Sequence, residues 1–532
     1  MRTKKVICLL LAMWFCVSVG ARDLQSLQNE FLKWKFGMFI HFNMSTFDGG
    51  TGWASGKKDP SIFNPEHLDV GQWADAAVSA KMKYAILTVK HTGGWCLWDT
   101  DLTDHDITAF KNYKEGKGDL VREFVDTFRE RGLKVGLYYC FPLWDSAWTN
   151  YWTLPMDDYV EETGDALGFV KAQFKELLTR YGKIDLVWID QSECTHGGLK
   201  DGDWIRFKAY IHTLQPDCLV IGNNTKDFER SDIFGYEYPY ALELPPLDNQ
   251  NPVEVCDKLN KGWFASVDQP APPVRSIDYV VNRLLRPLND RHSNYLLNCS
   301  PESTGLFNEK TVAMLKEIGR IWDPNEPSHK ADPLYGILRS TISKVPTEKN
   351  EVGLIFPPSF TPKEMLQAAE KLFNHGASGT FFVREETAKK GEKIFDKLLL
   401  RRNELGNGSR STTLLSDLKT GLEIGAEVRA VSSILGTDFP LTAFRAPQDQ
   451  YNDLVWDVLN YFNLIPVQPS KELVAGAIIE VPTPDQLDAI LKALKQKNLK
   501  PVTVSQLMLD SSSPRLKSLA SDATAKVVSG AR

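Results

Sequence analysis

The sequence predicts an α/β protein that consists of a (β/α)8-like TIM barrel followed by a second α/β domain. Between residues 34 and 322, short β-forming runs alternate with amphipathic helical stretches, which is typical of parallel α/β architectures. None of these strands leads into a G-x-G-x-x-G turn, and this favours a barrel over a dinucleotide-binding fold. The length of 532 residues leaves room for a second domain, because one α/β barrel takes about 250 residues.

The strands predicted for the barrel are short and rich in branched and aromatic residues. They cover residues 37–41, 84–89, 135–139, 184–189 and 218–222. Helical periodicity between them is clearest over residues 120–131, 166–180 and 204–214. Six or more such βα units predict a barrel domain over residues 22–328.

A stretch rich in proline and charged residues, 323–333, is predicted to be a linker. Beyond it, a strand at 352–356, a helix at 362–374 and a strand at 379–383 begin a new α/β series. We expect this second domain to cover residues 335–510. The serine- and alanine-rich tail, 511–532, is expected to be frayed.

The first 21 residues are typical of a cleaved signal peptide. Three cationic residues precede an apolar run over residues 6–19, and small residues precede a cut at Arg22. The run is shorter than the roughly 20 residues of a membrane-spanning helix, and no later segment is long and apolar enough to serve. The sequence therefore predicts a secreted or periplasmic protein without a membrane span.

The overall charge excludes one class of partner and the aromatic content suggests another. A formal net charge of −6 provides no basic surface for phosphate, so nucleic acid is not expected as a partner. The 14 tryptophans are compatible with an ordinary core and also with platforms for carbohydrate rings. The sequence does not predict an oligomeric state.

The cysteines indicate neither a zinc knuckle nor a disulfide scaffold. Those that follow the signal peptide are scattered, without C-x-x-C spacing. They are Cys96, Cys140, Cys194, Cys218, Cys256 and Cys299. One or two disulfide bridges remain open, and the sequence does not pair them.

Polar residues follow the carboxyl ends of five successive predicted strands. In a βα barrel this rim is where the loops assemble the active site. Each polar residue alone could simply cap a strand, but five in succession predict one shared site. They are His41, the pair Lys90 and His91, Tyr139, Asp190 and Asn223.

Four motifs in this region resemble a known family. They read FGMFIHF at 36–42, KHTGGW at 90–95, LVWID at 186–190 and NYLLNCSP at 294–301. In this order and spacing they are similar to glycoside hydrolase family 29, the retaining α-L-fucosidases, over roughly residues 25–322. The resemblance implies a fucosylated glycan as substrate, exo-cleavage of terminal α-L-fucosyl residues, and no metal or organic cofactor.

The resemblance also implies roles for three carboxyl groups. Asp190 matches the family's nucleophile at the end of its strand. For the acid/base, Glu254 is the first choice, because Glu254-Val255-Cys256 followed by Trp263 resembles the family's W-E-x-C stretch. Glu237 is the second choice, because it lies where another branch of the family carries its acid in a G-N-E-type turn. A retaining glycosidase needs both groups, a carboxylate that attacks and a carboxyl that donates a proton.

Further residues are expected to bind the sugar. His41 and His91 match family residues that hydrogen-bond the ring hydroxyls, while Trp53 and Trp95 could pack against the apolar face of the sugar. Lys90, Tyr139 and Trp263 complete the predicted substrate-binding set.

Two departures from the family pattern leave alternatives open. Thr92-Gly93 stands where the family commonly has histidine and aspartate, and Gly52 stands where it has glutamate. Loss of an imidazole that binds a hydroxyl would weaken recognition of fucose. A glycosidase for a related α-linked deoxyhexose or α-L-galactoside, or a barrel that binds carbohydrate without turnover, therefore remains possible.

The second domain resembles a polysaccharide deacetylase of the NodB-like type, a distorted βα-barrel. The resemblance rests on TFFV at 380–383, ELGN at 404–407 and FRAP at 444–447. That family binds zinc through an aspartate pair and two histidines, whereas this chain has Pro357-Pro358 and Gly408-Ser409-Arg410-Ser411 at those places. Since these side chains cannot replace carboxylate and imidazole ligands, we expect a degenerate domain without metal.

Overall fold

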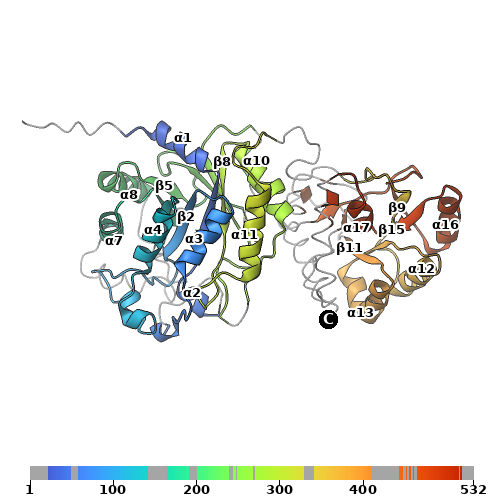
Figure 1. Cartoon of the computed structure of the whole chain (residues 1–532), viewed down its shortest axis with the longest axis horizontal. Coiled ribbons are helices and arrows are strands. Elements are labelled where there is room, and N and C mark those ends of the chain that lie inside the picture. Colours follow the sequence, from blue (N-terminus) through green and yellow to red (C-terminus); the bar gives the residue numbers. More distant parts are fainter. Residues whose placement is uncertain are drawn as a thin grey trace, which may run out of the picture.

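The computed structural model describes most of the chain and contains two parallel sheets, one of eight strands and one of seven (Figure 1). None of the helices in the described part combines the length and apolar character that a membrane-spanning helix needs. The described residues are 22–49, 58–141, 165–190, 201–238, 244–246, 248–267, 270–328, 341–408, 443–446, 451, 455–456, 459, 464–513, 516–517 and 520.

The first sheet is a nearly closed parallel barrel. Its strands are β1 (Phe36–Ile40), β2 (Tyr84–Lys90), β3 (Lys134–Cys140), β4 (Leu186–Asp190), β5 (Leu219–Gly222), β6 (Phe234–Glu237), β7 (Val253–Lys258) and β8 (Ser293–Asn298). They are hydrogen-bonded in the order β5-β4-β3-β2-β1-β8-β7-β6. Between β5 and β6, only an isolated bridge from Ile221 to Ile233 closes the circle. All eight carboxyl ends therefore lie at one rim, as in a TIM barrel.

The helices of this unit are α1 (Leu24–Trp34), α2 (Met44–Phe47), α3 (Val70–Ser79), α4 (Leu120–Glu130), α7 (Ala166–Arg180), α8 (Asp201–Leu214), the π-helix η5 (Tyr279–Leu285), α10 (Arg286–Asn289) and α11 (Glu309–Ile321). Single 3-10 turns are η1 (Pro60–Ile62), η2 (Ile107–Ala109) and η3 (Lys114–Gly116). Four helices begin at an aspartate whose carboxylate accepts a hydrogen bond from a backbone N–H of the first turn. These N-caps are Asp23, Asp69, Asp119 and Asp165.

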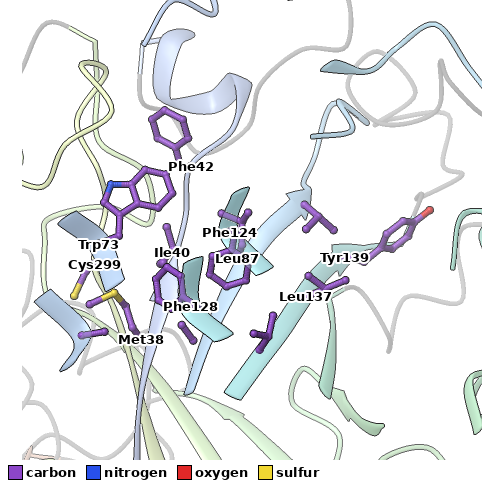
Figure 2. Close-up of a cluster of buried hydrophobic side chains, with 14 of the residues drawn as sticks. Met38, Ile40, Phe42, Trp73, Leu87, Phe124, Phe128, Leu137, Tyr139 and Cys299 are labelled. Atoms are coloured by element: carbon purple, nitrogen blue, oxygen red, sulfur yellow. The ribbon is translucent and has the colours of Figure 1, made fainter. Parts of the chain in front are cut away.

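The strands of the barrel separate two layers of core. Alternate residues point inward and pack with one another, as Phe39, Tyr138 and Trp188 do. The others point outward against the helices, and Figure 2 shows Leu137 of β3 in this outer layer with Phe124 and Phe128 of α4. The inward set is thus separated from the outward set, and only inward side chains near the carboxyl ends of the strands can reach a common site.

The five strands predicted from the sequence are confirmed, with bounds that differ by no more than two residues. The barrel also contains β6, β7 and β8, which were not among the predicted strands. Strand β6 has only four residues, one of them glycine, and glycine and short length both weaken a β-strand pattern.

The second sheet has the strand order β13-β12-β11-β10-β9-β14, with β15 also paired to β9. The capping box of Thr361 and Glu364 opens α12 at the predicted residue. The elements are β9 (Glu351–Phe356), α12 (Pro362–Asn374), β10 (Thr380–Val383), α13 (Glu385–Leu400), β11 (Glu404–Gly408), β12 (Ala443–Arg445), β13 (Ile465–Pro466), β14 (Ile478–Glu480), η7 (Pro484–Gln486), α16 (Leu487–Gln496), β15 (Lys500–Val502) and α17 (Val504–Leu509). The predicted α/β character of this region is confirmed.

Five of the six cysteines considered above lie in the described part of the chain. All five are buried free thiols: Cys96, Cys140, Cys218, Cys256 and Cys299. Cys194 lies outside the described residues. No disulfide therefore joins any two of these five.

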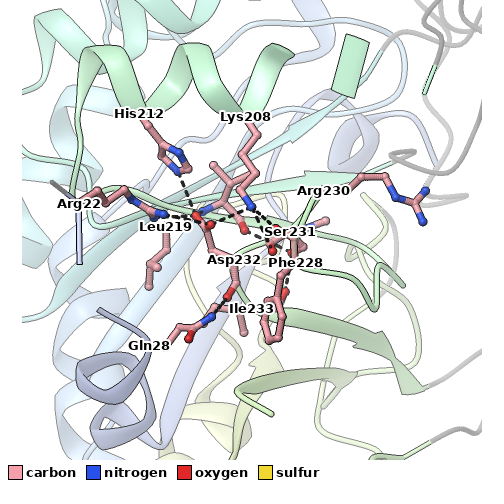
Figure 3. A network of polar contacts seen from close by, with 12 residues as sticks. Arg22, Gln28, Lys208, His212, Leu219, Phe228, Arg230, Ser231, Asp232 and Ile233 are labelled. Carbon is pink, nitrogen blue, oxygen red and sulfur yellow. Dashed lines mark hydrogen bonds and ion pairs between the residues drawn. The ribbon is translucent and has the colours of Figure 1, made fainter. Parts of the chain in front are cut away.

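A buried polar network holds the seam between β5 and β6 (Figure 3). The carboxylate of Asp232 is fully buried and contacts Arg22 at 2.8 Å, His212 at 3.0 Å and Lys208 at 3.1 Å. It also accepts a hydrogen bond from the backbone N–H of Val220 on β5 (2.9 Å). Burial by itself would raise the pKa of Asp232, but the hydrogen bond of His212 and the charges of Lys208 and Arg22 hold it well below its ordinary value. These contacts join β5 to β6 where the ladder is interrupted.

We expect Asp232→Asn to lower the free energy of unfolding by about 3 kcal/mol at pH 7, because it leaves buried cations without their counter-charge. The pKa of Asp232 is lower in the folded state, so its contribution is present above the unfolded pKa and disappears as the pH falls. Urea unfolding at pH 7 measures the first effect, and unfolding at a series of pH values below about 4 measures the second, since the contribution is lost only below the unfolded pKa of the carboxyl. Asp126→Asn on α4, where the carboxylate is 56% exposed, is the control and should change stability by less than about 0.5 kcal/mol. Equal losses in both variants would contradict this role of Asp232.

Candidate active site

Two carboxyl groups face each other across the interior of the barrel at its carboxyl rim. Asp190 is the last residue of β4 and Glu237 the last residue of β6. Asn223, directly after β5, lies between them and donates from Nδ2 to Oδ1 of Asp190 (2.9 Å) and to Oε2 of Glu237 (2.7 Å). These two carboxyl oxygens are therefore no more than 5.6 Å apart, the sum of the two distances.

The surroundings of Glu237 raise its tendency to hold a proton. Burial, and then the negative charge of Asp190, raise the pKa of Glu237 to about 7, while Asn223 and Lys258 act in the opposite direction. Near neutral pH, Glu237 therefore carries a proton part of the time. A carboxyl of this kind beside a carboxylate can act as an acid and then as a base.

Tyr138 supports Asp190 from the neighbouring strand β3. Its hydroxyl donates to Oδ2 of Asp190 at 2.7 Å. Burial, followed by the charge of Asp190, raises the pKa of Tyr138 well above its ordinary value, so the phenol stays a donor. The ring stacks against Trp188 and His91, at centroid distances of 5.4 and 5.3 Å. Both oxygens of Asp190 thus have a hydrogen-bond donor on a buried support.

His41 faces the same site as a neutral imidazole of defined tautomer. Asn298 donates from Nδ2 to the carbonyl of Trp263 (2.9 Å), so its Oδ1 faces His41 and accepts from Nδ1 at 2.7 Å. This leaves the Nε2 atom of His41 as a hydrogen-bond acceptor. Burial, followed by the nearby His91, lowers the pKa of His41 well below its ordinary value.

Aromatic rings line the site beside His41. The rings of His91, Trp263 and Phe264 lie 5.6, 4.9 and 5.1 Å from that of His41. Burial lowers the pKa of His91 to about 3, so this imidazole is also neutral at pH 7. Hydrogen-bonding groups next to flat apolar faces are suited to a ligand that carries both hydroxyls and C–H groups.

Comparison with known proteins identifies the family to which this barrel belongs. The model of the family "Alpha-L-fucosidase" matches residues 57–326, about half of the chain, and this range contains both carboxyl groups. The chain belongs to the α-L-fucosidase family. The nearly closed eight-stranded barrel is the fold expected of such a glycoside hydrolase.

Individual α-L-fucosidases are similar over about half to three fifths of this chain. α-L-Fucosidase 1 of Arabidopsis thaliana is 30% identical over 317 residues, which cover 54% of this chain and 59% of that protein. Human tissue α-L-fucosidase is 24% identical over 269 residues, which cover 48% of this chain and 53% of that protein. The solved structure of α-L-fucosidase isoenzyme 1 from Paenibacillus thiaminolyticus is 28% identical, with 60% and 80% of the two chains covered and a TM-score of 0.45. The chain thus spans about three fifths of the length of the Arabidopsis relative.

Within this α-L-fucosidase-family barrel, Glu254 lies away from the rim, contrary to the expectation that it stands beside Asp190. It is the second residue of β7, near the amino end of the strand, and 1% exposed. Its carboxyl accepts hydrogen bonds from Tyr84, the first residue of β2, and from the indole of Trp188, both at 2.7 Å. Burial raises the pKa of Glu254 to about 7 as well, so location rather than pKa distinguishes the two glutamates. Between them, the structure brings Glu237 and not Glu254 to Asp190.

Lys90 and Tyr139 also lie elsewhere than expected, on the outer face of the barrel. A bulge between Thr88 and Lys90 shifts the register of β2 and turns Lys90 toward the helices. There its ammonium donates to the hydroxyl of Tyr139 (2.8 Å) and to Gln173 of α7 (3.1 Å). Figure 2 shows Tyr139 in the outer hydrophobic layer. Lys90 and Tyr139 are therefore not at the expected sugar site. They form a buried polar contact that supports the packing of β3 against α7.

Trp95 lies in the outer core and does not extend the described site. Trp95 is 3% exposed and stacks on His105, with ring centroids 3.4 Å apart, and against Phe110 in the outer core. Trp53 and Gly52 lie outside the described residues. Thr92, one of the two departures from the family pattern, places its hydroxyl 3.0 Å from Nδ1 of His91 and so helps to orient that ring.

The sequence prediction gave no role to four residues of the site: Tyr138, Asn223, Phe264 and Asn298. Asn223 was noted at the end of its strand without a role, and Asn298 lies within the motif at 294–301. The alternation of inward and outward residues would have selected Tyr138 over Tyr139, since Trp188 and Asp190 share its inward register. Nothing in the sequence pattern identifies Phe264.

Proposed function

We propose that the protein is a retaining exo-α-L-fucosidase that hydrolyses terminal α-L-fucosyl residues of glycans. The carboxyl pair at the rim carries this proposal. Asn223 donates to one oxygen of each group, so these two oxygens lie within 5.6 Å of each other, which is compatible with the close carboxyl pair, about 5–5.5 Å apart, of retaining glycosidases.

In the first step, a carboxylate oxygen of Asp190 attacks the anomeric carbon while Glu237 protonates the departing glycosidic oxygen. The C–O bond to the aglycone breaks and an ester to Asp190 forms, so that Glu237 is left as a carboxylate. In the second step, Glu237 takes a proton from a water molecule, whose oxygen attacks the anomeric carbon and releases Asp190. Fucose leaves with its original anomeric configuration, and both carboxyl groups return to their starting states.

The sugar ring is held by the neutral imidazoles and the aromatic wall. The Nε2 atom of His41 accepts a hydrogen bond from a ring hydroxyl, and His91 contributes a second polar contact. Trp263 is half-buried and presents its ring beside His41, where the apolar face and methyl group of fucose can pack. Because both histidines stay neutral well below pH 7, substrate binding should depend little on pH above about 5.

The test is hydrolysis of 4-nitrophenyl α-L-fucoside, followed by NMR of the first product. We expect α-L-fucose to appear before mutarotation, with much slower turnover of the α-L-galactoside and the α-L-rhamnoside. Faster hydrolysis of the galactoside would assign the enzyme to a related sugar. Binding of fucose without hydrolysis of any of the three glycosides would point to a carbohydrate-binding barrel.

The protein is proposed to act outside the cytoplasm, in the medium or the periplasm. The proposal rests on the cationic start, the apolar run and the small residues before Arg22. Amino-terminal sequencing of the exported protein should begin at Arg22. A start at Met1 in active protein purified from the cytoplasm would contradict it.

For the second domain we propose a degenerate deacetylase-like unit that holds no zinc. Strand β9 ends at Phe356 and is followed by Pro357 and Pro358, whose side chains offer no ligand atom. Residues 409–411 of the second expected ligand motif lie outside the described residues. Elemental analysis of the full-length protein should find well under one zinc per chain. Stoichiometric zinc, together with acetate release from acetylated xylan, would contradict this view.

A further inference from the structure

Asn223 makes a contact that a simple strand-end cap would not make. Its Nδ2 atom carries two hydrogens, and the two carboxyl groups at the rim receive one each. The amide must lie this way round, because the opposite orientation would place its oxygen against the oxygens of Asp190 and Glu237. Both N–H donors of this amide are therefore committed to the carboxyl pair.

The backbone around Asn223 fixes the amide in this position. Its own N–H donates to the carbonyl of Ile189 on β4 (2.8 Å), one residue before Asp190. Asn224 follows with a φ of +51° and accepts the backbone N–H of Glu237 on its side-chain oxygen (3.0 Å). At Gly235 on β6, a Cβ atom would lie 2.4 Å from the carbonyl oxygen of Gly222, so only glycine permits this close approach. The turn thus connects both carboxyl-bearing strands to one buried side chain, which is 8% exposed.

We propose that Asn223 is the positioning residue that keeps the two carboxyl groups in separate roles, by occupying one oxygen of each. With Oε2 of Glu237 accepting from the amide, the acid's proton is held on Oε1, the atom left for the glycosidic oxygen. With Oδ1 of Asp190 also accepting from the amide, that oxygen is not available to share the acid's proton. This inference rests on the proposed function for the identity of the two groups, but not for the geometry.

Without the amide, the two carboxyl groups lose the hydrogen-bond donor that lies between them. Carboxyl groups at short range in a dry site tend to share a single proton, which raises the pKa of one of them. Among the described residues, the titratable groups that act on Glu237 are Asp190 of β4, Tyr138 of β3, and Cys256 and Lys258 of β7. Of these only Lys258 opposes protonation of Glu237, as Asn223 does. Removal of the amide should therefore raise the pKa of Glu237.

The experiment is a 13C NMR titration of glutamate side-chain carboxyls in the full-length protein, with the Glu237 signal assigned by Glu237→Gln. We expect Asn223→Ala to raise the pKa of Glu237 by about one unit, and the isosteric Asn223→Asp, which adds a third carboxylate, to raise it further. The high-pH limb of kcat/KM for an aryl α-L-fucoside should shift upward by the same amount. At pH 6, kcat should fall about 10- to 100-fold while KM changes little.

Asn249→Ala is the matched control. The amide of Asn249 donates to the carbonyls of Asn251 and Arg291 (2.8 and 2.7 Å) at the amino end of the barrel strands, so its loss should lower stability without moving either titration. An unshifted Glu237 titration in folded Asn223→Ala or Asn223→Asp would overturn the inference. If the wild-type protein does not hydrolyse the fucoside, the proposed function fails, and the NMR titration still decides the role of Asn223.

Discussion

Asp190→Asn should reduce kcat for aryl α-L-fucosides by on the order of 10^4-fold or more, with the fold unchanged. The amide keeps the shape of the side chain and can still accept from Tyr138, but it cannot form the glycosyl ester. Glu237 cannot substitute, because it lies on the far side of the Asn223 amide and must donate the proton. Steady-state kinetics and thermal unfolding of the same preparation measure the two effects.

The smaller variant Asp190→Gly tests the same role by chemical rescue. Azide can enter the space left by the carboxylate and attack the anomeric carbon directly, so β-L-fucosyl azide, with inverted configuration, should form. Asp217→Asn is the control, since Asp217 is exposed in the turn before β5, at the opposite end of the barrel. Activity of Asp190→Asn within about tenfold of wild type would contradict the assignment.

The sequence predicted the barrel more fully than it predicted the site. The βα alternation and the polar strand ends placed His41, His91 and Asp190 at one rim, because parallel strands share the direction of their carboxyl ends. Which way a side chain points also depends on local register. The bulge in β2 turned Lys90 outward, and no residue pattern signals that bulge.

The acid/base could not be chosen from the sequence because both glutamates follow family-like motifs. Glu254 stands early in β7, and its motif predicts neither that it is buried nor that Tyr84 and Trp188 hold it. Glu237 stands at the end of a strand too short to be predicted. Only the register of β6 against β7, which pairs Glu237 with Cys256, shows that the two glutamates lie at different heights in the barrel.

The pH dependence of the wild-type enzyme should reflect Glu237. Because the acid must be protonated to act, kcat/KM should fall as the pH rises through about 7, the raised pKa of this carboxyl. Glu237→Gln should abolish that limb, since the amide does not titrate. A limb that survives unchanged in Glu237→Gln would assign it to another group.

Glu237→Ala should affect substrates according to their leaving groups. An activated dinitrophenyl fucoside needs no acid for bond cleavage, so its first step, seen as the initial release of dinitrophenol, should be nearly as fast as in wild type, whereas cleavage of a disaccharide should slow about 10^2- to 10^4-fold. Steady-state turnover of the activated substrate should fall, because the second step has lost its general base. Azide should restore turnover of the activated substrate and yield α-L-fucosyl azide, with retained configuration, because azide attacks the ester on Asp190 without a general base. In Glu254→Gln, by contrast, the amide nitrogen would face one of the two donors, Tyr84 or Trp188, so we expect a stability loss of about 1–3 kcal/mol and an effect on rate that is independent of the leaving group. If azide rescues a folded Glu254 variant and not Glu237→Ala, the buried glutamate is the acid/base and the assignment made from the geometry of the rim is wrong.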